Sequence, residues 1–157
     1  QEINRADVIL YFYLFMYGGV YADMDFECVN NFEYIIPKDR VSIAESPWKY
    51  DGRGETHQNA LMISPPNHPF WQIVFKKLME ARSEPDVLWA TGPRVIINAI
   101  NECDPRMINS LNMYEFAPIY DGKNFPAGDK KRNTLLTGSI NKGVFTRHYG
   151  TATWIEK

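Results

Sequence analysis

The stretch Tyr17–Cys28, YGGVYADMDFEC, places two aspartates one residue apart just after a double glycine. It follows RADVILYFYLFM, one of the most apolar runs of the chain. In extended backbone, residues i and i+2 point to the same side, so Asp23 and Asp25 can address one cation from a single short segment. The alternative is a solvated acidic turn, and Asp-x-Asp spacing taken alone favours that reading.

The elements around the two acids are predicted from the local pattern. Asn4 is expected to cap a helix whose apolar residues run from Val8 to Phe15, and Gly18 follows as a helix stop. Asp7 lies one turn inside this helix. Val20–Ala22 reads as a short strand, so the acids are expected at the carboxyl end of a strand.

The rest of the chain alternates between strand and helix patterns. Strands are predicted at 41–44, 60–63, 114–119 and 144–149, a helix opening at 67–69 with Pro69 in its first turn, and a third helix at 94–102 capped by Thr91. Strands that alternate with helices imply an α/β sheet covered on both faces.

Size and composition narrow the function further. A chain of 157 residues with 45% hydrophobic residues suits one folded domain spanning 1–157, and its net charge of −2 argues against a nucleic-acid polymer as partner. No run reaches the roughly 18 apolar residues of a membrane span. Cys28 and Cys103 read as reduced, incidental thiols.

The chemistry that suits the paired acids is metal binding. Carboxylate oxygens are the ligands preferred by Mg²⁺ and Mn²⁺, which keep water or phosphate oxygens in their other positions. A diphosphate is therefore the natural third partner of Asp23 and Asp25. Glu27 follows at the same alternation and is a candidate third acid of the cluster.

Four segments in order resemble the DXD-containing sugar-binding family of glycosyltransferases, which includes yeast mannosyltransferases, sphingolipid and capsule glycosyltransferases and, more distantly, clostridial glucosylating toxins. The segments are RADVILYFYLFMYGGVYADMDFEC (5–28), QNALMISPPNHPFW (58–71), WATGP (89–93) and HYGTATW (148–154). Thr153 stands where the family usually has Ser.

The resemblance implies an α/β fold of GT-A type, similar to a Rossmann sheet, and a retaining transfer of a hexose from a UDP- or GDP-linked sugar to a glycan, lipid or protein. It implies that Asp23 contacts the donor's ribose or sugar and that Asp25 ligates Mn²⁺ or Mg²⁺, which bridges the donor's diphosphate. Both acids are therefore candidate catalytic and metal-binding residues. Asp7 would hydrogen-bond the sugar hydroxyls; its other reading is to complement the helix dipole.

Four further residues are candidates with a structural alternative each. Arg5 pairs with Asp7 or with a phosphate, or is solvated, and Asn59 binds a sugar hydroxyl or satisfies a turn. His148 completes the metal shell or is structural. Trp154 stacks on the donor or anchors packing.

The chain departs from the family in two places. Leu10 stands where the family commonly has an Arg facing the donor, and no segment before Arg5 resembles the family's first nucleotide-binding strand. We expect either that the domain is truncated at its N-terminus or that the protein dispenses with this strand. Both departures favour a second hypothesis, a non-catalytic module that binds a nucleotide sugar or glycan. A glycoside hydrolase fits less well, because its two acids must flank a scissile bond. The sequence leaves localisation open between a cytoplasmic and a Golgi-lumen setting.

Overall fold

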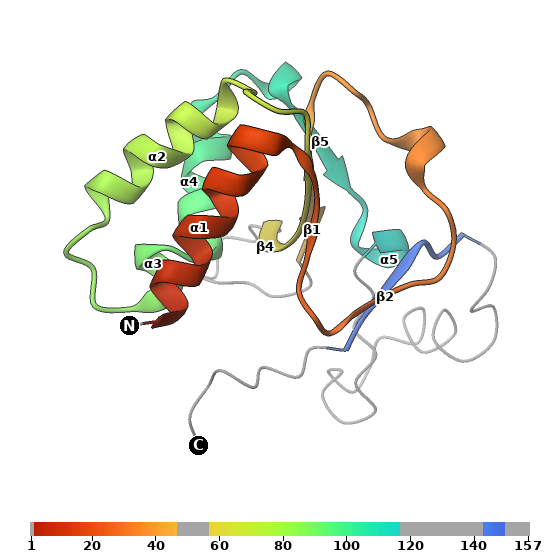
Figure 1. The fold of residues 1–157 in the computed structure, drawn as a ribbon, viewed down its shortest axis with the longest axis horizontal. Coiled ribbons are helices and arrows are strands. Elements are labelled where there is room, and N and C mark those ends of the chain that lie inside the picture. The colour runs from red at the N-terminus through yellow and green to blue at the C-terminus, as the bar shows by residue number, and fades with distance from the viewer. Residues whose placement is uncertain (1, 47–56, 117–142, 150–157) are drawn as a thin grey trace.

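The computed structural model describes residues 2–46, 57–116 and 143–149 of the chain (Figure 1). Along these residues the elements are α1 (Glu2–Tyr17), β1 (Gly19–Ala22), β2 (Phe26–Cys28), η1 (Glu33–Ile35), β3 (Val41–Glu45), β4 (His57–Ser64), α2 (Phe70–Glu80), α3 (Val87–Ala90), α4 (Pro93–Glu102), η2 (Pro105–Met107), β5 (Ile108–Leu111), α5 (Met113–Phe116) and β6 (Thr146–His148).

The first helix is longer than its sequence pattern predicts. It begins at Glu2, so Asn4 lies inside its first turn and the predicted cap at Asn4 is wrong. Glu2 is a good helix former whose charge suits the first turn, which extends the helix beyond the apolar run. Its end is as predicted, because Gly18 has a φ of 66° and donates its N–H to the carbonyl of Leu14.

The central sheet has four strands in the order β1-β4-β3-β5. β4 pairs antiparallel with both β1 and β3, and β5 joins β3 in parallel. β2 and β6 form a separate antiparallel pair. In Figure 1, helices α1 to α4 lie on one side of the four-stranded sheet, whereas α5 and β2 lie on the other.

The larger core lies between the sheet and helices α1, α2 and α4. Trp71 and Tyr11 are fully buried there and stack with ring centroids 5.9 Å apart. Ile43 and Met62 supply the sheet side of the same cluster. The Trp71 indole donates to the hydroxyl of Ser64, which fixes the start of α2 against the end of β4.

A second cluster covers the opposite face of the sheet. Leu61 and Ala44 point into it by strand alternation, and Phe116 of α5 stacks on Phe145 at 4.9 Å. Aromatic side chains from short segments, rather than long helices, close this face. The expected α/β sheet with both faces covered is therefore confirmed.

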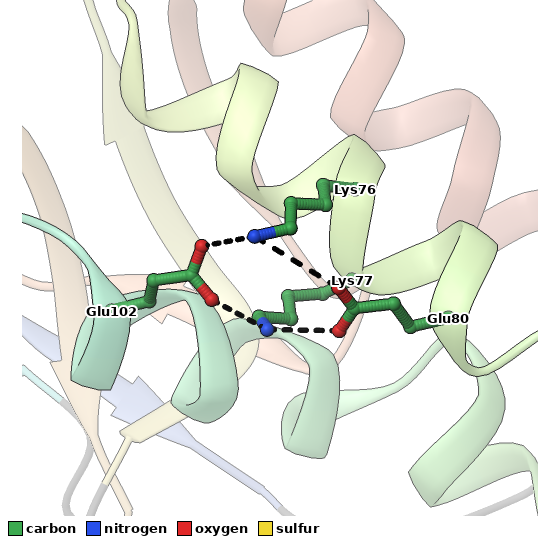
Figure 2. Close-up of polar contacts among 4 residues, drawn as sticks. All are labelled: Lys76, Lys77, Glu80 and Glu102. Atoms are coloured by element: carbon green, nitrogen blue, oxygen red, sulfur yellow. Dashed lines mark hydrogen bonds and ion pairs between the residues drawn. The ribbon is translucent and has the colours of Figure 1, made fainter.

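Figure 2 shows an ion-pair cluster that joins the C-terminal turns of α2 and α4. Lys76 and Lys77 each place Nζ 2.6 Å from a carboxylate oxygen of Glu102, and Lys77 also lies 2.8 Å from Glu80. Hydrogen bonds from Lys76 and then Lys77 lower the pKa of Glu102 to about 2. Lys76, Glu80 and Glu102 are exposed and Lys77 is partly buried, and such pairs near the surface add little to stability.

Three predicted elements need correction. Thr91 does not cap the third helix, because Gly92 occupies the N-cap of α4 and Thr91 ends α3. The predicted strand 114–119 is wrong at its start, which is helix α5; 117–119 lie outside the described residues. Of the predicted strand 144–149, only Thr146–His148 is a strand.

Candidate active site

The two acids lie on a tight turn between β1 and β2. Asp23 directly follows the last residue of β1, as expected, and its N–H donates to the carbonyl of Ala60 at 2.9 Å. The N–H of Phe26 donates back to the Asp23 carbonyl at 3.0 Å. The backbone between the acids is thus a turn, not the extended segment we assumed, with Met24 fully exposed at its tip.

Strand β6 brings a histidine to this turn. Its pairing with β2 sets His148 directly opposite Phe26, and the two rings stack at 4.3 Å with 13° between their planes. Nε2 of His148 lies 3.4 Å from Oδ1 of Asp25. One ligand atom from each of Asp23, Asp25 and His148 lies within 4.8 Å of the others.

This spacing and donor set fit a hard divalent cation. Ligands bonded at about 2.1 Å to one ion lie at most about 4.2 Å apart, so small side-chain rotations complete the set. Burial lowers the pKa of His148, against the opposing charge of Asp25, and so favours the neutral imidazole that a metal requires. Its Nδ1 is buried and has no hydrogen-bond partner among the residues that the structure describes.

The pKa of the Asp23 carboxyl is influenced by burial, by Tyr21 and by Asp25. Burial raises the pKa of its carboxyl, the hydrogen bond from Tyr21 lowers it, and the charge of Asp25 raises it again. The Tyr21 hydroxyl donates to Oδ1 of Asp23 at 2.7 Å. Tyr21 therefore holds one oxygen of Asp23 in place and leaves the other to bind a ligand.

A second polar cluster is built around Asp7 on α1. Asn59 donates to its Oδ1 at 3.1 Å and the Thr91 hydroxyl donates to its Oδ2 at 2.9 Å. Tyr11, one turn further along α1, accepts from Asn59 and donates to the carbonyl of Thr91. The carboxylate of Asp7 is thus fixed by two residues from other elements, Asn59 of β4 and Thr91 at the end of α3.

Asp7 is held in an unusual protonation range. Its pKa is raised to about 6. Burial is the main cause and the charge of Asp23 adds to it, whereas the hydrogen bond from Thr91 opposes the rise. The charge of Asp23 thus acts on Asp7 in the same direction as burial. A ligand that carries positive charge or hydroxyl donors would relieve the repulsion.

An irregularity in β4 aims Asn59 at this cluster. Ile43 pairs with Met62, yet Glu45, two residues on, pairs with His57, so β4 holds three extra residues at this point. Such a bulge turns a side chain out of strand alternation. Asn59 thereby reaches α1.

The structure places the other predicted site residues differently. Arg5 is exposed near the start of α1, and it forms no ion pair with Asp7. Glu27 is not a third acid of the metal cluster, because its carboxylate bonds to Arg147 and Tyr149. Trp154 lies outside the described residues.

Sequence reasoning missed three residues of the site. Tyr11, Tyr21 and the hydroxyl of Thr91 hold Asp23 and Asp7 in position. Two of them had a usable signal: Tyr11 lies four residues after Asp7 on the same helix face, and Tyr21 lies two before Asp23 on a strand. Thr91 belongs to the WATGP segment of the family resemblance, but its long-range contact with Asp7 had no signal in the sequence.

No helix among residues 2–46, 57–116 and 143–149 is long and apolar enough to cross a membrane.

Comparison with known proteins finds similarity over the segment that holds the acidic turn. A family model described as "Glycosyltransferase sugar-binding region containing DXD motif" matches residues 1–42, which include Asp7, Asp23 and Asp25. The solved structure of the PaToxG glycosyltransferase superposes with a TM-score of 0.51 and 22% identity, over 65% of this chain and 35% of that one. This likeness confirms the α/β fold of GT-A type.

Two curated proteins are similar in sequence. A mannosyl phosphorylinositol ceramide synthase of Saccharomyces cerevisiae is 31% identical over 99 residues, which is 60% of this chain and 24% of the synthase. An uncharacterized glycosyltransferase of Acanthamoeba polyphaga mimivirus is 25% identical over 131 residues, or 78% of this chain and 51% of that protein. The chain thus spans a quarter to a half of the curated relatives it matches. The chain is similar to glycosyltransferases, and its residues 1–42 match the model of their sugar-binding region containing a DXD motif.

Proposed function

We propose that the protein is a metal-dependent retaining glycosyltransferase that moves a hexose from a UDP- or GDP-linked sugar to a hydroxyl of a glycan, lipid or protein. The observation that carries the proposal is the convergence of Asp23, Asp25 and His148 at one turn beside the buried Asp7 cluster. A donor complex contains a cation and a sugar. The three residues at the turn would hold the cation, and the Asp7 cluster would hold the sugar.

The residues divide between the diphosphate and the sugar. Asp25, Asp23 and His148 would hold Mn²⁺ or Mg²⁺, which when bound offsets the charge that develops on the leaving diphosphate. Asp7, fixed by Asn59 and Thr91, would accept hydrogen bonds from sugar hydroxyls. Arg5 and Trp154 stay proposed donor contacts.

The proposed transfer needs no strong base from the protein. The bond from the sugar's anomeric carbon to the diphosphate oxygen breaks, and a bond to the acceptor oxygen forms on the same face. The acceptor's proton passes to the departing phosphate oxygen. The chain's contribution is then to orient the donor and to exclude water from the sugar.

The acceptor class is suggested by one relative. The yeast synthase is named for mannosyl phosphorylinositol ceramide, a mannosylated sphingolipid. We therefore place a mannose donor and a lipid acceptor first among those to be tested. A glycan or protein hydroxyl remains within the proposal.

The second candidate function is a non-catalytic nucleotide-sugar or glycan binding module. Leu10 favours it, because this residue is buried in the core against α2 and does not face a donor as the family's usual Arg would. In such a module the cation and the sugar bind, but the sugar is not transferred.

Donor hydrolysis separates the two functions. The protein is incubated with UDP-glucose, UDP-galactose, UDP-N-acetylglucosamine or GDP-mannose, with Mn²⁺ or with chelator, beside Asp25→Asn and the surface control Glu33→Gln. Mn²⁺-dependent release of UDP or GDP that is lost only in the Asp25 variant supports the enzyme. Mn²⁺-dependent donor binding without release supports the binding module. Absence of both contradicts both functions.

A further inference from the structure

The pair of strands that carries His148 is short and needs support. β2 and β6 share only three residue pairs. The entry to β6 is held firmly: Asn30 donates its side-chain amide to the carbonyl of Val144 at 2.7 Å, and the Thr146 hydroxyl donates to the carbonyl of Phe116. At the exit of β6 the structure describes further contacts of Tyr149.

Glu27 supplies contacts on both sides of the histidine. Its Oε2 accepts from Nη1 of Arg147 at 3.1 Å and from the Tyr149 hydroxyl at 2.7 Å. Arg147 is the residue directly opposite Glu27 in the strand pair. One carboxylate of β2 thus binds both chain neighbours of His148.

Strand alternation explains why this arrangement directs the imidazole. Arg147 and Tyr149 point to the face of the strand pair that carries Glu27, so His148 points to the other, where Phe26 and Asp25 lie. The Tyr149 N–H also donates to the carbonyl of Asp25 at 2.9 Å. By fixing Arg147 and Tyr149, Glu27 therefore keeps the ring of His148 over the acidic turn.

The imidazole has little else to orient it. A metal-binding histidine usually donates its second ring nitrogen to a carboxylate or carbonyl, which fixes the ring. Nδ1 of His148 has no such partner in the described part of the chain. The ring is held by stacking on Phe26 and by the position of its own strand.

We propose that Glu27 is a positioning residue for His148, which acts through Arg147 and Tyr149 to hold the imidazole at Asp25 for a divalent cation. The proposal deepens the proposed function, on which its metal-binding half rests. Glu27 itself is not a ligand, because its carboxylate is engaged on the opposite face of the strand pair. An exposed ion pair is ordinarily weak, but this one needs only to restrict a single strand end.

Mn²⁺ affinity, measured by calorimetry, gives the first test. Glu27→Ala should weaken binding about tenfold, the lower end of the range for outer partners of metal ligands. Tyr149→Phe removes one of the two contacts and should weaken it less. Glu33→Ala, an exposed glutamate outside the strand pair, is the matched control and should bind Mn²⁺ as the parent does.

The imidazole signals give a second test that needs no metal. The chain has three histidines, so ring ¹H–¹⁵N signals can be assigned with one variant each. Glu27→Ala and Tyr149→Phe should shift or broaden the His148 signal and leave those of His57 and His68 in place. A His148 signal unchanged in both variants would overturn the proposal, as would Mn²⁺ binding equal to that of the parent.

The two tests separate this inference from the proposed function. A parent protein that binds no Mn²⁺ contradicts the proposed function, whereas the His148 signal still decides whether Glu27 positions the ring. If Glu27→Ala does not fold, Tyr149→Phe keeps the carboxylate and the fold and carries both measurements.

Discussion

Nε2 of His148 lies 3.4 Å from Oδ1 of Asp25, although the two residues come from opposite ends of the described chain. The contact exists because β6 pairs with β2, the strand that leaves the acidic turn. Two carboxylates from one loop become a three-residue cluster only through this pairing. The proposed metal site therefore depends on long-range folding as much as on the Asp-x-Asp motif.

Loss of the histidine should weaken the metal site. His148→Asn is expected to lower Mn²⁺ affinity by more than about tenfold, because even an outer partner of a ligand commonly contributes that much. His57→Asn, which removes a histidine outside the cluster, should leave the affinity unchanged. Competition with a fluorescent Mn²⁺ indicator measures both. Equal affinities in the two variants would remove His148 from the site.

Asp7 should make stability depend on pH. Its pKa is about 6 in the fold against 3.8 for an ordinary Asp, so the fold favours the protonated form. The stability from this group is full below about pH 4 and is lost as the pH rises through 6, an effect of about 2–3 kcal/mol. Urea unfolding of the parent and Asp7→Asn from pH 4 to 7.5 measures it. The free energy of unfolding of Asp7→Asn should rise relative to that of the parent as the pH rises. A difference that stays constant with pH would contradict the raised pKa of Asp7.

The hydroxyl of Thr91 should matter most when Asp7 is charged. Thr91→Val keeps the side-chain shape but removes the 2.9 Å hydrogen bond to Oδ2. The expected loss of unfolding free energy is about 2 kcal/mol at pH 8 and about 1 kcal/mol at pH 4, because hydrogen bonds to charged groups are the stronger ones. Tyr11→Phe, which removes a neighbouring hydroxyl, should cost about the same at both pH values. A pH-independent loss in Thr91→Val would argue against an ionised Asp7.

The two glycines before the acidic turn should differ in tolerance. A Cβ on Gly18 would lie 2.6 Å from the carbonyl oxygen of Ser64, whereas one on Gly19 meets nothing within 4 Å. Both have positive φ, so Gly19→Ala should cost about 1 kcal/mol from backbone strain alone and Gly18→Ala clearly more. Chemical denaturation compares them. Equal losses would mean that the contact with Ser64 relaxes freely.

Much of the site's local structure was predictable from the sequence. The apolar run, the glycine stop at Gly18 and the strand before Asp23 are each set by neighbouring residues, and all three predictions are confirmed. The turn between Asp23 and Asp25 was misjudged, because the reach of two acids was argued from extended backbone. A turn brings the same carboxylates together by a different route.

Short-range propensity also misled at one element. The aromatic residues of Tyr114–Phe116 favour a strand, yet Asn112 accepts the N–H of Tyr114 and starts helix α5. A capping side chain overrides the strand preference of so short a segment. The three-residue strand β2 was missed, because it is too short to show an alternating pattern.

The long-range part of the site was beyond local reasoning. The meeting of Thr91 with Asp7, and the bulge that turns Asn59 toward α1, depend on how distant strands and helices pack. For His148 and Asn59, only the family resemblance pointed to a role. Neither spacing nor periodicity carries that information.

The central claim is that Asp23, Asp25 and His148 hold one divalent cation for a sugar donor's diphosphate. The most direct test is diffraction at the manganese edge from crystals grown with Mn²⁺ and UDP or GDP. We predict one anomalous peak within ligand distance of Asp23, Asp25 and His148, next to the bound diphosphate. A diphosphate bound with no manganese at this turn, or manganese bound only elsewhere, would contradict the account.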